Sequence, residues 1–103
     1  VAVSFEERSV EERAAILRAC GNASYARGDY GGAEAFYHKA LQLVAGQPEA
    51  LNNLAACALA RSPARPAQAL VHLDALLASA DGARNAKARL RKARCCVMLG
   101  KLE

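Results

Sequence analysis

Apolar side chains recur along this chain every three or four residues, which is the spacing of one face of an α-helix. The pattern predicts a first helix over about 10–27, a second over about 32–44 and a fifth over about 83–99. A third helix is predicted to begin at 48 and to include Leu51–Leu59, and a fourth to follow residues 62–66 and to include 69–77. Strands would need period-two runs rich in Val, Ile and Thr, and the sequence has none. The predicted fold class is therefore all-α.

Local signals mark where these helices begin and end. Ser9-x-x-Glu12 has the pattern of a capping box, and a weaker Ser4-x-x-Glu7 predicts a short helical turn before it. Pro48 suits the first position of a helix, where a missing N–H costs nothing. The segment 62–66, with two prolines, and the dipeptide Asp81-Gly82 interrupt the helical pattern, so both are predicted turns.

The helices are predicted to form repeated hairpins. The spacing of small and bulky residues from Leu17 to Ser24 recurs 34 residues later from Leu51 to Ala58. A third copy follows 38 residues after Leu51, at Arg89, with the extra residues in loops, where insertions cost least. A helical hairpin of about 34 residues that cannot bury its own apolar face is the unit of a stacked array.

The residues that carry the repeat are Leu17, Gly21, Asn22, Gly28, Tyr30, Ala33, Tyr37, Ala40 and Leu41 in the first unit, Leu51, Leu54, Ala55, Ala69 and Leu73 in the second, and Ala88, Ala93 and Gly100 in the third. This pattern resembles the tetratricopeptide repeat family over nearly the whole chain. The resemblance implies a right-handed superhelix of antiparallel helix pairs with about 2.5 repeats. It also implies one domain over 1–103, with repeats at about 14–47, 48–84 and 85–103.

The third repeat is predicted to be truncated. Residues 100–103 have the pattern of a turn into a sixth helix that does not follow. The apolar face of the fifth helix would then lack a partner, and a terminal unit of an array normally carries a polar cap. We therefore expect further domains of the same chain, or another protein, to cover this helix.

Charge is distributed unevenly along the 103 residues. The net charge is +4 and the isoelectric point is near 9.1. Glutamates crowd the segment 6–12, whereas the segment 87–94 is strongly basic. A basic balance is compatible with nucleic acid, an acidic membrane surface or an acidic peptide, so the position of the charge matters more than its total.

Cysteine and histidine positions do not indicate a cofactor. The four cysteines have no zinc-site spacing, and we expect them to be reduced packing residues, with Cys20 and Cys57 on apolar faces. His38 and His72 are expected to be exposed helix residues without metal-ligand neighbours. No signal peptide or run of 18 apolar residues is present, so a cytoplasmic protein, found also in the nucleus, is predicted, with no membrane partner.

Polar residues on the first helix of each hairpin form a candidate binding site, because these helices line the concave groove of such an array. Arg18 and Asn22 share one face of the first helix at i,i+4 spacing, Asn53 lies on the third, and Lys87 and Arg91 share one face of the fifth. Cations and amides donate charge-assisted hydrogen bonds to carboxylates, each worth about 1.5–3 kcal/mol. The pattern therefore favours an acidic ligand.

These five positions are similar to the two-carboxylate clamp of chaperone-binding tetratricopeptide domains, with Arg18 where lysine is more usual. The resemblance implies a non-catalytic adaptor that binds the Glu-Glu-Val-Asp tail of the seventy- or ninety-kilodalton heat-shock chaperones. Arg18, Asn22 and Asn53 would hold the terminal carboxylate and last side chain. Lys87 and Arg91 would hold another carboxylate of the tail.

Other interpretations remain open at this point. The three cations could be solvated surface residues, and the two asparagines could bond neighbouring backbone. A scaffold that assembles subunits or self-associates without binding a tail is the alternative function. The basic run 84–94 could contact nucleic acid, but no aromatic residues interleave it, so this partner is not predicted. No catalytic arrangement of Ser, His, Cys and Asp is recognisable, and neither an enzyme nor a cofactor is predicted.

Overall fold

The computed structural model describes residues 3–79 and 84–100. Over these residues the chain is all-helical, as predicted, and contains no strand. The elements are a 3-10 turn η1 (Phe5–Glu7) and the helices α1 (Val10–Ala26), α2 (Tyr30–Leu43), α3 (Pro48–Ala60), α4 (Pro66–Ala78) and α5 (Ala86–Met98).

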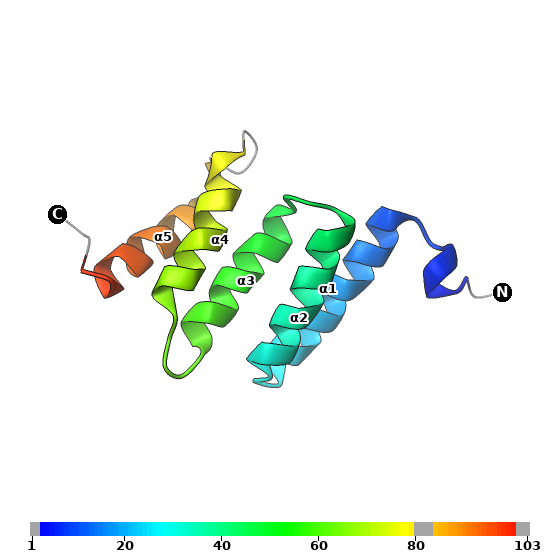
Figure 1. Cartoon of the computed structure of the whole chain (residues 1–103), viewed down its shortest axis with the longest axis horizontal. Coiled ribbons are helices and arrows are strands. Elements are labelled where there is room, and N and C mark those ends of the chain that lie inside the picture. The colour runs from blue at the N-terminus through cyan, green and yellow to red at the C-terminus, as the bar shows by residue number, and fades with distance from the viewer. Residues whose placement is uncertain (1–2, 80–83, 101–103) are drawn as a thin grey trace.

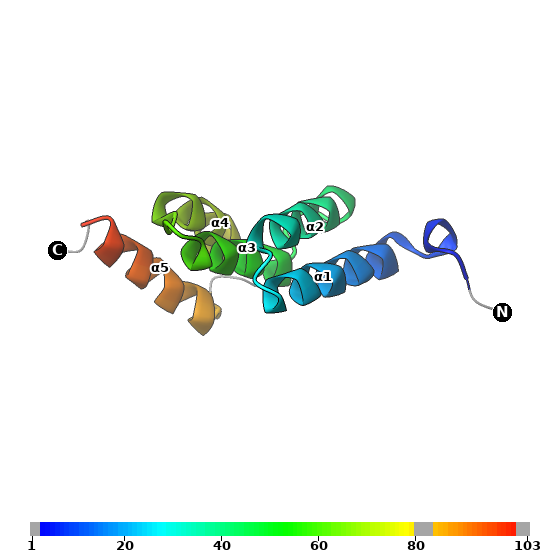
Figure 2. The ribbon, with the colours of Figure 1, turned by 90° about the horizontal axis from the view of Figure 1, so that it is seen from below.

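Consecutive helices pack side by side and run in opposite directions, so that α1, α3 and α5 point the same way (Figure 1). In the view turned by 90°, α2 and α4 lie along one edge and α1 and α5 along the other (Figure 2). The central helix is α3, which contacts α1, α2 and α4. The molecule is elongated, with extents of 57 × 32 × 18 Å, and α1 and α5 lie at its opposite ends.

Most predicted helix starts are confirmed, and two are shifted. The fifth helix begins at Ala86 rather than near residue 83, because Asn85 caps it by accepting a hydrogen bond from Ala88 N at 3.0 Å. Ser9 forms the full capping box with Glu12, and Pro48 occupies the first turn of α3. The second helix begins at Tyr30 rather than near residue 32, because the Asp29 carboxylate accepts a hydrogen bond from Gly32 N at 2.9 Å. An aspartate in this position satisfies a free amide of the first turn, so the helix can include the two glycines.

The core consists mainly of small and branched side chains between paired helices. Leu54 and Ala55 of α3 and Leu73 of α4 are completely buried. Gly21 of α1 lets the ring of Tyr37 approach the helix backbone, since a Cβ at this glycine would lie 2.5 Å from Tyr37 Cε1. The core of the first two hairpins therefore includes the repeat residues Gly21, Ala33, Tyr37, Leu54, Ala55 and Leu73.

Some sequence predictions are corrected or lie outside the described residues. His72 was expected to be exposed, but it is half-buried and its ring lies 5.8 Å from that of His38, centroid to centroid. The cause is the packing of α4 near α2, which a pattern within one helix does not reveal. The predicted turn at Asp81-Gly82 and the end of the chain from Lys101 fall outside the described residues.

Residues 3–79 and 84–100 contain neither a membrane-spanning helix nor a cluster of metal ligands. None of these helices combines the length and apolar character that crossing a bilayer requires. No three His, Cys, Asp or Glu side chains in this part of the chain come together as metal ligands.

Candidate functional site

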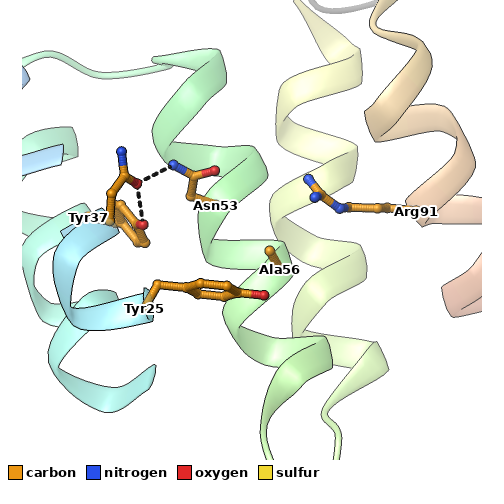
Figure 3. Close-up of a pocket in the computed structure, with 6 residues that line it drawn as sticks. Tyr25, Tyr37, Asn53, Ala56 and Arg91 are labelled. Atoms are coloured by element: carbon orange, nitrogen blue, oxygen red, sulfur yellow. Dashed lines mark hydrogen bonds between the residues drawn. The ribbon is translucent and has the colours of Figure 1, made fainter. Parts of the chain in front are cut away.

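A cavity of about 260 Å³ is lined by residues of α1, α2, α3 and α5 (Figure 3). Its lining residues are Asn22, Tyr25, Tyr37, Asn53, Ala56 and Arg91. Three of the five predicted site residues, Asn22, Asn53 and Arg91, are therefore brought together although they lie on three separate helices.

Two hydrogen bonds orient the Asn22 amide. The Tyr37 hydroxyl donates to Asn22 Oδ1 at 2.6 Å, and Asn53 Nδ2 donates to the same oxygen at 3.1 Å (Figure 3). The amide oxygen is thus occupied, while the Asn22 NH2 group has no partner among the described residues. An amide NH2 group can only donate hydrogen bonds. A ligand that contacts it must therefore present a hydrogen-bond acceptor.

The tyrosine that holds this amide is itself well fixed. Tyr37 is 1% exposed. Burial, with smaller contributions from Cys57 and Tyr25, raises the pKa of its hydroxyl to about 12. The hydroxyl is therefore protonated at neutral pH and acts as a permanent donor to Asn22.

Arg91 supplies the positive charge of the cavity. Its guanidinium extends from α5 toward α3 (Figure 3) and donates to Asn52 Oδ1 at 2.5 Å. A longer contact joins it to the Asn52 backbone oxygen at 3.4 Å. These partners are neutral, so they position the guanidinium without cancelling its charge.

Arg18 does not line this cavity. Its guanidinium donates to Gln47 Oε1, and its Nη2 lies 4.0 Å from a Glu49 carboxylate oxygen. Gln47 is in turn held by the backbone oxygens of Ala40 and Val44, each at 2.8 Å. Arg18 is thus bound in a separate depression one helical turn N-terminal of Asn22.

Lys87 also lies beyond the lining of the cavity. It is exposed on α5, one turn N-terminal of Arg91, and no described residue forms an ion pair with it. The Lys87 side chain is long and flexible, so from one turn away it can reach a ligand at the rim of the cavity.

The cavity continues into a second one of similar size. The two share Tyr25, Ala56 and Arg91, and the second is lined in addition by Leu59, Ala60 and Arg94. Sequence reasoning did not assign these residues to the site. The available signal was their spacing, because Tyr25, Ala56 and Arg94 each follow a predicted site residue by three positions on the same helix.

The lining of the combined site carries hydrogen-bond donors and positive charge. It includes amide and guanidinium donors and no acidic side chain. The nearby Cys57 is not an activated nucleophile, because burial, together with the Glu34 charge, raises the pKa of its thiol to about 12. The site can therefore bind an anion, and no general base or thiolate lies among its lining residues.

Comparisons with known proteins found no matching protein-family model, no matching curated protein and no matching solved structure. The class that the fold defines is an all-α protein built from successive helix hairpins.

Proposed function

We propose that this protein is a non-catalytic adaptor of the tetratricopeptide type that binds the acidic C-terminus of a partner protein. The observation that carries the proposal is the Asn22 amide, whose oxygen accepts from Tyr37 and Asn53 and whose NH2 group has no partner within residues 3–79 and 84–100. Arg91 lines the same cavity, and no acidic side chain of the described residues forms an ion pair with it. Fixed donors beside an uncompensated cation select a carboxylate.

The tail class follows from the resemblance of the five sequence positions to a two-carboxylate clamp. The proposed ligand is a Glu-Glu-Val-Asp type tail of the seventy- or ninety-kilodalton heat-shock chaperones. Asn22, Asn53 and Arg91 would contact the tail within the cavity, Lys87 would reach it from the rim, and Arg18 would join by exchanging Gln47 for a ligand carboxylate. The place of action would be the cytoplasm or nucleus, where these chaperones occur.

The proposal is tested by titrating a free-acid Met-Glu-Glu-Val-Asp peptide and its C-terminally amidated form into the protein by calorimetry. We expect a Kd on the order of micromolar for the free acid, about −8 kcal/mol, and weaker binding as salt rises. Asn22→Ala and Arg91→Ala should each weaken binding at least about tenfold, because each removes a bond to a charged group.

Arg89→Ala is the matched control, because Arg89 is an exposed α5 arginine that lines neither cavity. This variant should bind the peptide as the native protein does. Equal binding of the free-acid and amidated peptides, or no binding by the folded protein, would overturn the proposal.

A scaffold function is the second candidate, and one observation favours it. Leu90 and Val97 of α5 are 72% and 56% exposed and lie seven residues apart, on one face of the helix. An exposed apolar face of this kind is typical of a surface that packs on another subunit. Self-association that rises with concentration and is unchanged in Lys87→Ala and Arg91→Ala, together with no tail binding, would favour the scaffold over the adaptor.

A further inference from the structure

Beside the amide-lined cavity lies a second cavity that has its own arginine. The first cavity contains Asn22 and Asn53, and the second contains Leu59, Ala60 and Arg94. The helices α1, α3 and α5 point the same way. On each of them the residues that line the second cavity lie nearer the C-terminal end than those that line only the first cavity, or extend further toward it. The two cavities therefore form one groove along the helix direction.

The second cavity combines an apolar floor with a free cation. Leu59, Ala56 and Ala60 supply apolar surface, and Tyr25 supplies an aromatic ring that is 36% exposed. Arg94 forms no ion pair with any described residue. An apolar floor under a guanidinium suits a side chain with a methylene stem and a terminal carboxylate, as in glutamate.

The basic charge of this face is not neutralised by the neighbouring helix. Asp74 of α4 lies 2.8 Å from Lys92 Nζ, and its hydrogen bond and charge raise the pKa of that lysine. Lys92 lines neither cavity, so Asp74 pairs with a lysine that lies outside the groove. Arg91 and Arg94 are thus left as the two uncompensated charges of the groove.

We propose that the second cavity is an acid-selective subsite in which Arg94 binds a glutamate upstream of the C-terminal residue of the tail. The inference rests on the proposed function, because it needs a peptide C-terminus at Asn22 and Asn53. The distance along α3 from Asn53 to Ala60 is about 10 Å at 1.5 Å per residue. An extended peptide rises about 3.4 Å per residue, so the third residue before the terminal one lies beside Arg94.

A double-mutant cycle between protein and peptide tests the subsite. The peptides are free-acid Met-Glu-Glu-Val-Asp, the same peptide with glutamine for its first glutamate, and a control with glutamine for its second. The proteins are the native chain, Arg94→Gln, which keeps the apolar stem, and Arg89→Gln as the matched control. We expect glutamine at the first position to weaken native binding about three- to fivefold, the scale of a partly exposed ion pair.

The same peptide change should weaken binding to Arg94→Gln less than twofold, whereas Arg89→Gln should respond as the native protein does. Equal losses in native and Arg94→Gln proteins, or a response to the second glutamate alone, would overturn the subsite and leave the adaptor function standing. Failure of the free-acid peptide to bind the folded native protein would overturn both.

Discussion

At the scale of single residues, the site depends on one close approach between a glycine and a tyrosine. Gly21 gives Tyr37 the room to lie against α1, and Tyr37 then directs its hydroxyl to Asn22. Neither residue is charged, but together they determine which end of the Asn22 amide is available to a ligand. The packing of Tyr37 against Gly21 thereby leaves the Asn22 NH2 group as the donor available in the cavity.

Substitution of Gly21 by alanine should destabilise the protein. The added Cβ would lie 2.5–2.9 Å from three ring atoms of Tyr37. Overpacking of this kind costs about 1–3 kcal/mol, which exceeds the gain of up to about 1 kcal/mol from helix propensity. Urea unfolding should therefore show a net loss of free energy of unfolding, and peptide affinity should fall with it.

Gly31→Ala is the control for this substitution. Gly31 is also helical, and nothing lies within 4 Å of a Cβ built on it. This variant should be at least as stable as the native protein, because alanine has the higher helix propensity and its Cβ meets no neighbour. A Gly21→Ala protein as stable as Gly31→Ala would contradict the packing argument.

At the scale of helices, short-range signals decide where each element begins. The Ser9 hydroxyl accepts from Glu12 N at 3.1 Å, and the Glu12 carboxylate accepts from Ser9 N at 3.1 Å. The hydrogen bond from Ser9 N to the carboxylate, with a smaller contribution from the Ser9 side chain, lowers the pKa of the Glu12 carboxyl. Asp29 and Asn85 cap α2 and α5 with one side-chain bond each. Such contacts span three residues, which is why most helix starts could be predicted from the sequence.

Removal of the cap at Ser9 should weaken α1. Ser9→Ala loses the bond to Glu12 N, and a substitution of this type costs about 0.5–2 kcal/mol. The expected result is a lower free energy of unfolding with no change in peptide affinity, since Ser9 is far from the cavity lining. Ser4→Ala, which removes only an exposed bond to the Glu7 carboxylate at 3.0 Å, should be nearly neutral. Equal losses in the two variants would refute the cap.

At the scale of the whole molecule, successive hairpins are joined by polar contacts between helices that are not neighbours in sequence. His38 of α2 and His72 of α4 meet ring to ring at 5.8 Å. His72 Nε2 is buried and has no partner among the described residues. Glu34 is bound to Arg61 nearby. The junction of α2 and α4 therefore contains a half-buried histidine whose Nε2 has no hydrogen-bond partner among the described residues.

Stability should depend on pH through this histidine. Burial, with a smaller contribution from the His38 charge, lowers the pKa of His72 below its ordinary value of 6.5, and Glu34 opposes the shift only in part. The unfolded chain then binds the proton at higher pH than the folded chain does. The free energy of unfolding is therefore not reduced by His72 above about pH 7. It falls as the pH drops through 6.5 toward the pKa of His72 in the folded protein.

Denaturant unfolding of the native protein and His72→Gln at pH 7.5, 6.5 and 5.5 measures this effect. The native protein should lose stability over this range, and the variant should lose less. His38→Gln, which removes the exposed partner, should keep most of the pH dependence, because burial is the larger cause. Parallel curves for the native protein and His72→Gln would show that His72 is not the titrating group.

The sequence by itself determined the helices and the residue types of the site. Caps, prolines and the three-to-four-residue apolar spacing act over one or two turns, so they can be read from neighbouring positions. The same spacing places Asn22, Asn53 and Arg91 on the first helix of each hairpin, and the structure brings these three into one cavity.

Only the tertiary structure decided which cations face that cavity. Arg18 and Arg91 each follow a leucine in the sequence, yet Arg18 is bound by Gln47 and Arg91 by Asn52, at separations of 29 and 39 residues. The orientation of the Asn22 amide and the burial of His72 likewise follow from partners on other helices. Such contacts depend on how helices pack, and spacing within one helix carries no information about them.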